Sequence, residues 1–545
     1  MASEKRGSAR GELTRRGALW SAGSVGAVAM AGRASAATAG RGPTPAREQS
    51  TVTTPADAVA VTRSGSVRGF KRGGVYVFKG IPYGADTGGS SRFRPPRPPQ
   101  AWTGVRLSLA YGPVCPQPPQ DRSMEAMAFV QDLDAGYERE DCLRANVWSP
   151  ALDRGAKLPV MVWLHGGGFV SGSSQELPPY DGENLARQGV VMVSVNHRLG
   201  PLGFLDLSSF GTEYASSANV GLLDLVLALE WVRDNISSFG GDPSRVTIFG
   251  HSGGGGKVSA LMAMPAAKGL FHRAVVMSGS FPLTDPRRDP RKLADGVFAG
   301  LGLAQGDLAG LTAAEPAKVI AAGFEAVRKL GPGANFGPAL DPAVLPEGWE
   351  SDAPRISAGV PMIIGNVRDE FRPIPIGIDE ADLIDAVPPS HRAQAGPIVA
   401  EARKAFPGHP PGDRAAIIRA MGIRNLALDQ ARKKHALMAA PVFSYWFTWP
   451  TPVLDGQVGV PHGSDVPAAF NNTALADQFT GNGPEARRVA RLMSRAWVNF
   501  ATTGDPSQPD LVWPRYDPIN IQTMVFDSHS RVERDPAGGL RRLLA

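Results

Sequence analysis

The 545-residue sequence predicts an α/β fold in which one large, mostly parallel central sheet carries helices on both faces. Three observations lead to this prediction. From residue 158 onward, short apolar runs alternate with stretches of helical spacing. Several of these runs are apolar throughout, which is typical of parallel strands buried on both faces. One of them ends at a glycine-flanked serine, Ser252, and a helical pattern follows directly.

The turn around Ser252 has the pattern G-x-S-x-G, with Gly250 and Gly254 two residues before and after the serine. A strand, this motif and a helix in succession form the nucleophile elbow of an α/β-hydrolase. The serine there adopts a strained backbone conformation that lifts its hydroxyl clear of the sheet, and the glycines let neighbouring chain pass close by. The motif alone also occurs in ordinary glycine-rich loops, so its interpretation depends on partners elsewhere in the chain.

The first 36 residues have the pattern of an export signal. Arg15 and Arg16 form a twin-arginine motif, a mildly apolar stretch follows, and an A-x-A cleavage site ends at Ala36, with an alternative ending at Ala39. We therefore predict a secreted protein that is exported by the twin-arginine route and cleaved near Ala36.

Three segments are expected: the export signal at 1–36, a flexible linker at 37–55, and a single α/β-hydrolase domain at 56–545. The formal net charge is +6, but residues 1–36 contribute six basic and two acidic side chains, which leaves about +2 for the rest. We therefore expect no nucleic-acid or membrane-surface partner. Outside the N-terminus we expect no apolar run close to the ~20 residues of a membrane helix. The oligomeric state is left open.

The two cysteines, Cys115 and Cys142, are expected to form one disulfide, because an even pair in an exported protein favours a bridge. The bridge would close a loop of about 27 residues and contribute roughly 3 kcal/mol in the chain-entropy model. Two reduced, buried cysteines are the alternative. Because the twin-arginine route carries folded cargo, the bridge would have to close after export or be tolerated open.

The body of the chain is expected to begin with antiparallel edge strands and to continue as an alternation of strands and helices. The expected strands are 59–62, 66–70, 75–78, 159–164, 190–195, 246–249, 274–277, 360–364 and 442–446. The expected helices are 222–236 and 489–500. Residues 375–440 are expected to be mostly helical and are the candidate for a cap over the site.

A serine hydroxyl is a weak nucleophile that needs a base, and the base needs an orienting acid. In α/β-hydrolases the acid and then the histidine follow the serine along the chain. His462 is the candidate base, because it stands in a loop soon after a buried strand. The other late histidines lie in helical, polar or proline-rich segments: His391, His409, His435 and His529. Asp369 and Glu370 both follow the strand at 360–364, and their order in the chain does not separate them.

The tetrahedral oxyanion of such a reaction needs backbone N–H donors that are fixed in advance, each worth on the order of 10²–10³ in rate. One is expected from Gly253, the residue after the nucleophile. The others are expected from the glycine run at 166–168, which follows the strand at 159–164. His251 directly precedes the serine, so its side chain is expected to point away from that of Ser252 and to be a packing or pocket residue.

With these residues in place, the chain resembles the type-B carboxylesterase/cholinesterase family, in particular its bacterial para-nitrobenzyl-esterase-like members. The resemblance extends from about Val59 to Pro518. It is carried by VFKGIPYG at 77–84, EDCL at 140–143, VNHRLGPLGF at 195–204, FGGDP at 239–243 and WPRYDP at 513–518.

The resemblance implies a serine carboxylesterase that needs no cofactor and no metal. It also separates the two acidic candidates in favour of Glu370. Carried over by position, the family pattern gives Ser252 as nucleophile, Glu370 as acid, His462 as base, and Gly167, Gly168 and Gly253 as oxyanion donors. Ser278 matches a serine that hydrogen-bonds within the triad, and the family pattern supports a Cys115–Cys142 bridge.

The chain departs from the family pattern at His251 and Gly253, where Glu and Ala are usual, and at Phe371, where glycine is common. The segment between the cysteines lacks the Trp with which cholinesterases bind a quaternary ammonium, which argues against a choline ester. We expect a secreted carboxylesterase that cleaves small-molecule esters through an acyl-enzyme. A lipase, a phenolic- or toxin-ester hydrolase, and a non-catalytic binding protein of the same fold are the alternatives.

Overall fold

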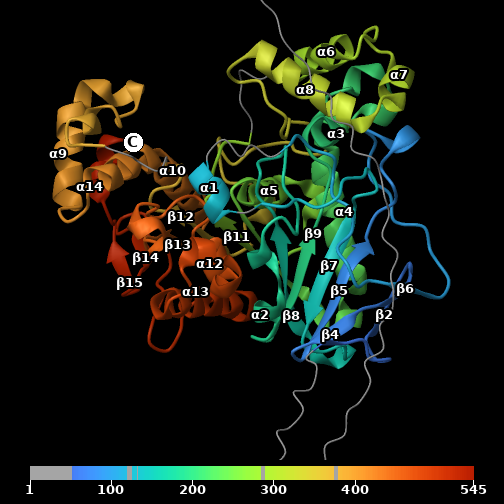
Figure 1. Ribbon diagram of the computed structural model, residues 1–545, viewed down its shortest axis with the longest axis horizontal. Coiled ribbons are helices and arrows are strands. Elements are labelled where there is room, and N and C mark those ends of the chain that lie inside the picture. Colours follow the sequence, from blue (N-terminus) through green and yellow to red (C-terminus); the bar gives the residue numbers. More distant parts are fainter. Residues whose placement is uncertain (1–51, 120–124, 132, 284–288, 373–377) are drawn as a thin grey trace, which may run out of the picture. The chain divides into compact units, whose positions relative to one another are not determined.

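The structure is a computed structural model that describes residues 52–119, 125–131, 133–283, 289–372 and 378–545 (Figure 1). The predicted export signal and nearly all of the predicted linker lie outside the described residues. The described residues belong to one compact unit, Ser50–Ala545.

Among the described residues, twelve strands form one sheet in the order β1-β4-β5-β7-β9-β8-β10-β11-β12-β13-β14-β15 (Figure 1). The strands from β9 to β14 in this order are parallel to their neighbours, whereas the edges next to β7 and β15 are antiparallel. The predicted mostly parallel sheet with antiparallel N-terminal edge strands is therefore confirmed.

The strands of this sheet are β1 (Val52–Thr53), β4 (Phe70–Arg72), β5 (Val75–Pro82), β7 (Arg144–Ser149), β9 (Val191–Val195), β8 (Leu158–Leu164), β10 (Gly241–His251), β11 (Arg273–Met277), β12 (Met362–Val367), β13 (Val442–Phe447), β14 (Gln522–Phe526) and β15 (Arg531–Arg534). A smaller sheet contains β2 (Val59–Thr62), β3 (Gly65–Arg68) and β6 (Val105–Leu107).

The α-helices are α1 (Glu125–Val130), α2 (Glu183–Ala186), α3 (Gly200–Phe204), α4 (Val220–Asn235), α5 (Gly253–Ala263), α6 (Pro290–Gly300), α7 (Leu308–Ala313), α8 (Pro316–Leu330), α9 (Ala395–Ala405), α10 (Pro411–Ala436), α11 (Val466–Ala469), α12 (Asp477–Thr480), α13 (Pro484–Thr503) and α14 (Gly538–Leu543).

Alternate side chains of the central strands enter two separate cores, one on each face of the sheet. In β8, Val160 and Val162 join the core that contains side chains of α4 and α5. Met161 and Trp163 join the other core, together with side chains of α2 and α13. Successive side chains of a strand point to opposite faces, so a strand between two helical layers must be apolar at every position. This is why the continuous apolar runs predicted these strands well.

One stretch, Thr212–Phe239, is long and apolar enough to cross a membrane, although the sequence was expected to hold no such run outside its N-terminus. It contains α4, and 78% of its most apolar window is buried inside the structure. Leu222, Leu225 and Leu229 pack in the core beneath the sheet. The stretch is therefore apolar because it contains a buried core helix.

The predicted Cys115–Cys142 disulfide is not present: both cysteines are free thiols and both are buried. Each thiol has partners in this state. Cys115 Sγ lies 3.2 Å from the N–H of Leu199, which donates to it, and 3.4 Å from the carbonyl oxygen of Pro116. A hydrogen bond with Cys115, together with burial, raises the pKa of the Cys142 thiol. The pair is thus the reduced, buried alternative.

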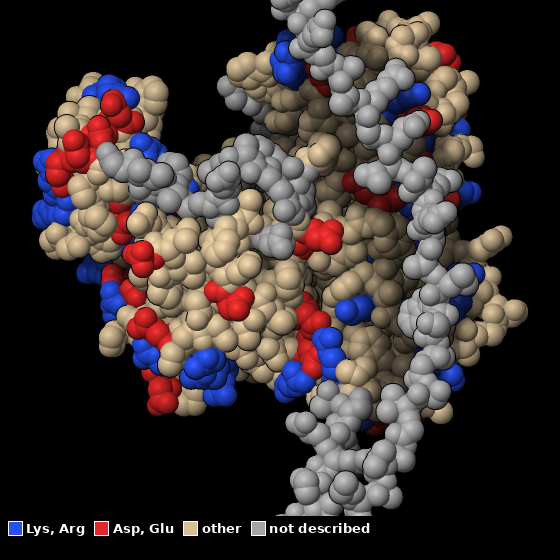
Figure 2. Space-filling model, in the orientation of Figure 1, with Lys and Arg blue, Asp and Glu red and all other residues tan. Residues whose placement is uncertain are grey.

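On the face shown in Figure 2, Lys and Arg side chains lie beside Asp and Glu side chains along the described residues. On this face the basic side chains are therefore interspersed with acidic ones and do not form one large basic patch.

Candidate active site

Ser252 stands at the sharp turn between β10 and α5, as the sequence predicted. Its backbone angles are φ 57° and ψ −126°, a conformation that L-residues rarely adopt. The turn is held by a 2.8 Å hydrogen bond that the N–H of Ser252 donates to the carbonyl of Met277. A Cβ atom on Gly254 would lie 2.0 Å from the carbonyl oxygen of Leu164. The second glycine of the motif is therefore required because α5 begins directly against the end of β8.

Glu370 and His462 are joined by a hydrogen bond of 2.5 Å between Oε2 and Nδ1. Their loops, which follow β12 and β13, are also joined through the backbone, since the N–H of His462 donates to the carbonyl of Glu370 at 2.8 Å. Glu370 has a φ of 46°, and its Oε1 accepts from Ser278 Oγ at 2.8 Å and from the N–H of Val367 at 3.1 Å. The predicted acid, base and supporting serine thus lie together.

Burial disfavours charge on both members of this pair. It lowers the pKa of His462 to about 3 and raises the pKa of Glu370 to about 8. The hydrogen bonds from Ser278 and Val367 oppose the shift of Glu370, because they favour its carboxylate form. Because a hydrogen bond joins the two groups, the protonation of one affects the pKa of the other.

Asp369, the other candidate acid, is bonded to different partners. Its carboxylate accepts from Arg368 Nε at 2.6 Å, from Arg372 Nη1 at 3.1 Å and from the N–H of Val460 at 2.8 Å. Burial opposes its charge, but the arginines hold the pKa of Asp369 below its usual value. Both arginines also contact Asp413 at the start of α10. Asp369 therefore fastens the acid loop to α10 and makes no contact with His462.

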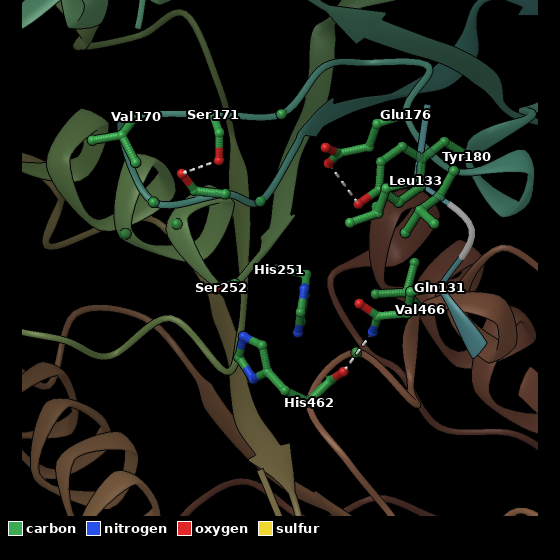
Figure 3. Close-up of a pocket in the computed structure, with 18 of the residues that line it drawn as sticks. Gln131, Leu133, Val170, Ser171, Glu176, Tyr180, His251, Ser252, His462 and Val466 are labelled. Atoms are coloured by element: carbon green, nitrogen blue, oxygen red, sulfur yellow. Dashed lines mark hydrogen bonds between the residues drawn. The ribbon is translucent and has the colours of Figure 1, made fainter. Parts of the chain in front are cut away.

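The imidazole of His462 lies between two other rings. The ring centroids of His251 and His462 are 4.3 Å apart, and those of Phe371 and His462 are 4.2 Å apart. Figure 3 shows His251 beside His462 in the cavity that also contains Ser252. His462 Nε2 is buried without a hydrogen-bond partner among the described residues, so it is free to accept a proton. His251, read from the sequence as a packing or pocket residue, thus lines the cavity and contacts the base.

The loop at 166–168 and the start of α5 line the same cavity as Ser252. Gly167 and Gly168 have φ values of 75° and 62°, which glycine adopts without strain. Within the described part of the chain, no acceptor is found for the N–H groups of Gly167 and Gly168. A Cβ atom on Gly253 would lie 2.2 Å from the carbonyl oxygen of Gly168. The two backbones therefore touch where the sequence predicted the oxyanion site.

The cavity has a volume of about 860 Å³. Its lining is rich in apolar and aromatic side chains: Val130, Leu133, Phe169, Val170, Leu177, Tyr180, Phe281, Leu283, Phe336, Phe371, Val466, Leu475 and Phe479. No described residue from 378–440 lines it, although that region is mostly helical as predicted. Helix α10 instead packs against β12 and β13, so this region supports the acid loop and does not cap the cavity.

Sequence reasoning missed two buried charged residues near the glycine loop, Lys257 and Glu176. Lys257 lies in α5 and is fully buried, and its Nζ donates to the carbonyl of His165 at 2.9 Å. Glu176 lines the cavity and accepts from Tyr180 at 3.2 Å (Figure 3). A signal was present, because Lys257 interrupts an otherwise small and apolar helix one turn after the nucleophile. Among the described residues, no cluster of three or more His, Cys, Asp or Glu side chains has the arrangement of a metal site.

Several known proteins that resemble this chain in sequence or in fold are esterases. The pattern of the Carboxylesterase family matches residues 56–386 and 417–538. Para-nitrobenzyl esterase of Bacillus subtilis (strain 168) is 35% identical over 500 residues, which cover 89% of this chain and 98% of that protein. Phenmedipham hydrolase of Pseudarthrobacter oxydans is 35% identical over 508 residues, covering 88% and 97%. The structure of an esterase from anaerobic Clostridium hathewayi, which can hydrolyse aliphatic aromatic polyesters, matches with a TM-score of 0.79 and 36% identity over 89% of this chain and 97% of that one.

Proposed function

Because the chain belongs to the carboxylesterase family and is a carboxylic ester hydrolase, we propose that it acts through a Ser252–His462–Glu370 triad. One observation carries the proposal: the strained serine and the unpartnered Nε2 of His462 face one cavity, while Glu370 holds the opposite nitrogen of that imidazole at 2.5 Å. This is the arrangement that activates a serine hydroxyl, since the base is oriented and kept neutral by its surroundings.

The proposed reaction is acyl transfer in two steps. His462 Nε2 takes the proton of Ser252 Oγ as this oxygen attacks the ester carbonyl. The negative charge that develops on the carbonyl oxygen is stabilised by the N–H groups of Gly167, Gly168 and Gly253. The protonated imidazole, oriented by Glu370, then gives its proton to the leaving alcohol. Water attacks the resulting acyl-enzyme with His462 again as base, and the carboxylic acid leaves.

The lining of the cavity supports esters with large, uncharged, apolar groups as substrates. The cavity of about 860 Å³ can bury a ligand of drug-like size, and aromatic side chains such as Phe169, Phe336 and Phe371 offer it apolar contact area. The acid groups that line it, Glu176 and Asp477, would oppose a negatively charged ester. The esterase from Clostridium hathewayi, to which the chain is similar, is described as hydrolysing aliphatic aromatic polyesters.

Secretion is part of the proposal and rests on the twin arginines Arg15 and Arg16. Replacing both with Lys keeps the charge but removes the motif, so the enzyme is expected to stay inside the cell. Esterase activity in the medium that does not fall in this variant would contradict the export route without affecting the triad.

The direct test is hydrolysis of p-nitrophenyl esters by Ser252→Ala. We expect turnover to fall to background while circular dichroism and the melting temperature stay close to those of the wild type. Ser280→Ala is the matched control, because Ser280 is buried in the loop after β11 and its hydroxyl has no partner among the described residues.

A panel of esters with different acyl chain lengths and alcohols separates an esterase from a lipase. A preference for long, water-insoluble chains would overturn the esterase proposal in favour of a lipase.

A further inference from the structure

We propose that Lys257 is a positioning residue that clamps the glycine loop from behind, so that its buried ammonium group orients and polarises the amide of Gly167 toward the oxyanion. The inference rests on the proposed function, because it concerns the oxyanion of that acyl transfer.

Lys257 is well placed for this role. It lies five residues after Ser252, one turn into α5, and its side chain is fully buried. Its Nζ donates to the carbonyl oxygen of His165 at 2.9 Å and to that of Gly166 at 3.4 Å. The Gly166 oxygen has a second, neutral partner, since Nδ1 of His165 lies 3.0 Å from it. Backbone carbonyls of the glycine loop are therefore direct partners of this buried cation.

The geometry of the peptide unit turns this contact into an effect on the cavity. The carbonyl of Gly166 and the N–H of Gly167 belong to one planar, trans peptide, so they point in opposite directions. A cation that binds the carbonyl on the inner side therefore directs the N–H toward the other side. It also draws electron density toward the oxygen, which makes the N–H a stronger donor in a low-dielectric site.

The other two oxyanion peptides are anchored at their carbonyls in the same way, but by neutral groups. The carbonyl of Gly167, whose peptide carries the N–H of Gly168, accepts from the N–H groups of Val170 and Ser171 at 3.2 and 3.1 Å. Ser171 Oγ adds a 3.3 Å bond to the same oxygen (Figure 3). The carbonyl of Ser252, whose peptide carries the N–H of Gly253, accepts from Gly256 at 3.1 Å. Lys257 thus supplies the charged anchor of the three.

Three titratable groups face Lys257 from neighbouring segments: Glu176, His165 and His197. Burial lowers the pKa of Lys257 to about 7, and the charge of Glu176 opposes this shift. Burial raises the pKa of Glu176 to about 7, opposed by Lys257 and by the hydrogen bond from Tyr180. The stacked rings of His165 and His197 are buried, which holds their pKa values well below the usual value and keeps them uncharged. Glu176 is therefore the nearby charge that sustains the cation.

The test compares Lys257→Met, which keeps the length of the side chain and removes its charge, with Lys257→Arg, which keeps a cation. Lys434→Met is the matched control. Lys434 is also buried and also donates to two backbone carbonyls, those of Ser357 and Ala358 at 2.5 and 3.0 Å, but it lies in α10 away from the cavity. Loss of one well-placed oxyanion donor costs about 10²–10³ in rate, so a disoriented donor is expected to cost about 10- to 100-fold.

For Lys257→Met we expect kcat to fall by that factor for p-nitrophenyl acetate, with KM changed by less than about twofold. The inhibition constant of a trifluoromethyl ketone, which forms a tetrahedral oxyanion on the serine, is expected to rise by a similar factor. Lys257→Arg is expected to recover part of the loss, and Lys434→Met to keep wild-type kcat. An unchanged kcat in Lys257→Met overturns the proposal, as does an unchanged inhibition constant or an equal loss in Lys434→Met.

The pH dependence gives a readout that a purely structural role would not move. As pH rises, a smaller fraction of Lys257 carries its proton, so the ratio of wild-type kcat to Lys257→Met kcat is expected to fall. Glu176→Gln removes the carboxylate that raises the pKa of Lys257. If Lys257→Met does not fold, the kcat of Glu176→Gln relative to wild type is measured instead and is expected to fall with rising pH, whereas a constant ratio overturns the proposal. Failure of the triad itself is recognised separately, because Ser252→Ala would then retain turnover.

Discussion

The two sides of the cavity are held in place by different kinds of contact. On the acid–base side, side chains fasten the loops: Arg368 and Arg372 bind Asp369, while Ser278 and His462 bind Glu370. On the nucleophile side, the start of α5 lies backbone against backbone on the end of β8 and the glycine loop, so that a Cβ atom on Gly254 would lie 2.0 Å from the carbonyl oxygen of Leu164. The acid–base side is therefore expected to be sensitive to the loss of a polar atom. The nucleophile side is expected to be sensitive to the gain of a single methyl group, and to the loss of a polar atom at Lys257.

The largest change in kcat is expected on the acid–base side of the cavity. Glu370→Gln is expected to lower kcat by about 10⁴-fold, because an orienting carboxylate both fixes the tautomer of the base and stabilises the imidazolium. Asp369→Asn is expected to leave kcat within about tenfold but to cost about 3 kcal/mol of unfolding free energy, because it removes one of the two carboxylates that pair with the buried arginines. The measurements are steady-state kinetics and urea denaturation at pH 7.5.

The sign of the pH effect on stability follows from the pKa of Asp369. Because the folded protein holds this pKa below its usual value, the contribution of Asp369 to stability is present at neutral pH and is lost as the pH falls through the folded-state pKa. Asp369→Asn should therefore flatten the loss of stability in acid. A larger loss of kcat at Asp369 than at Glu370 would reverse the assignment of the acid.

On the nucleophile side, Gly254→Ala is expected to lower kcat by about 10²–10³-fold, because the added Cβ would lie 2.0 Å from the carbonyl oxygen of Leu164 and displace the start of α5 with its oxyanion donor. Gly256→Ala is the matched control in the same helix, since its Cβ would lie 3.5 Å from the ring of Phe169, an ordinary contact. Esterase assays and the inhibition constant of a trifluoromethyl ketone measure both variants. Equal activity of the two variants would show that the close approach at Gly254 has no catalytic consequence.

A smaller effect is expected at Ser278, which donates to the carboxylate of Glu370. A hydrogen bond to a charged group contributes about 1.5–3 kcal/mol, so Ser278→Ala is expected to lower kcat by roughly 10- to 100-fold near neutral pH. The lost bond favours the ionised form, so its removal raises the pKa of the Glu370–His462 pair, and the rising limb of the pH–rate profile moves to higher pH. Ser280→Ala should leave the profile in place; a profile of Ser278→Ala that superposes on the wild type would remove this serine from the triad's support.

The smallest effect is expected at Phe371, whose ring lies 4.2 Å from that of His462 although its side chain is 62% exposed. An aromatic pair contributes about 0.5–1.5 kcal/mol beyond area burial, so Phe371→Ala is expected to lower kcat about 2- to 10-fold. Phe129→Ala, which removes a similarly exposed ring that does not line the cavity, should have no effect. Burst kinetics at several pH values measure the change, and a loss confined to KM would show that Phe371 serves substrate contact alone.

The sequence predicted most of the sheet because burial on both faces leaves a continuous apolar signal, as in β8 and β13. It also predicted the strained turn at Ser252, where the glycine pattern has a direct steric cause. It could not separate Asp369 from Glu370, because two adjacent carboxylates differ only in which loop each one faces. The family resemblance made that choice, and the hydrogen bond between Glu370 and His462 provides its physical reason.

The remaining misses concern contacts between segments far apart in the chain. A bridge between Cys115 and Cys142 was expected because the chain has an even number of cysteines and a predicted export signal. Both cysteines are instead free thiols, and the N–H of Leu199 donates a hydrogen bond to Cys115. The role of Lys257 depends on the carbonyls of His165 and Gly166, about 90 residues away in the chain. No local pattern reports such a contact, because backbone carbonyls are present at every residue.

The most direct test of Ser252 as the nucleophile is to trap the acyl-enzyme and identify the residue that carries the acyl group. The wild-type protein is mixed with a p-nitrophenyl ester, quenched in acid within milliseconds, and analysed by intact-mass and peptide mass spectrometry, with Ser252→Ala treated in parallel. If Ser252 is the nucleophile, we expect a burst of p-nitrophenol equal to the enzyme concentration and one added acyl group on the peptide that contains Ser252. Both should be absent from the variant. An acyl group on another residue, or turnover retained in Ser252→Ala, would contradict it.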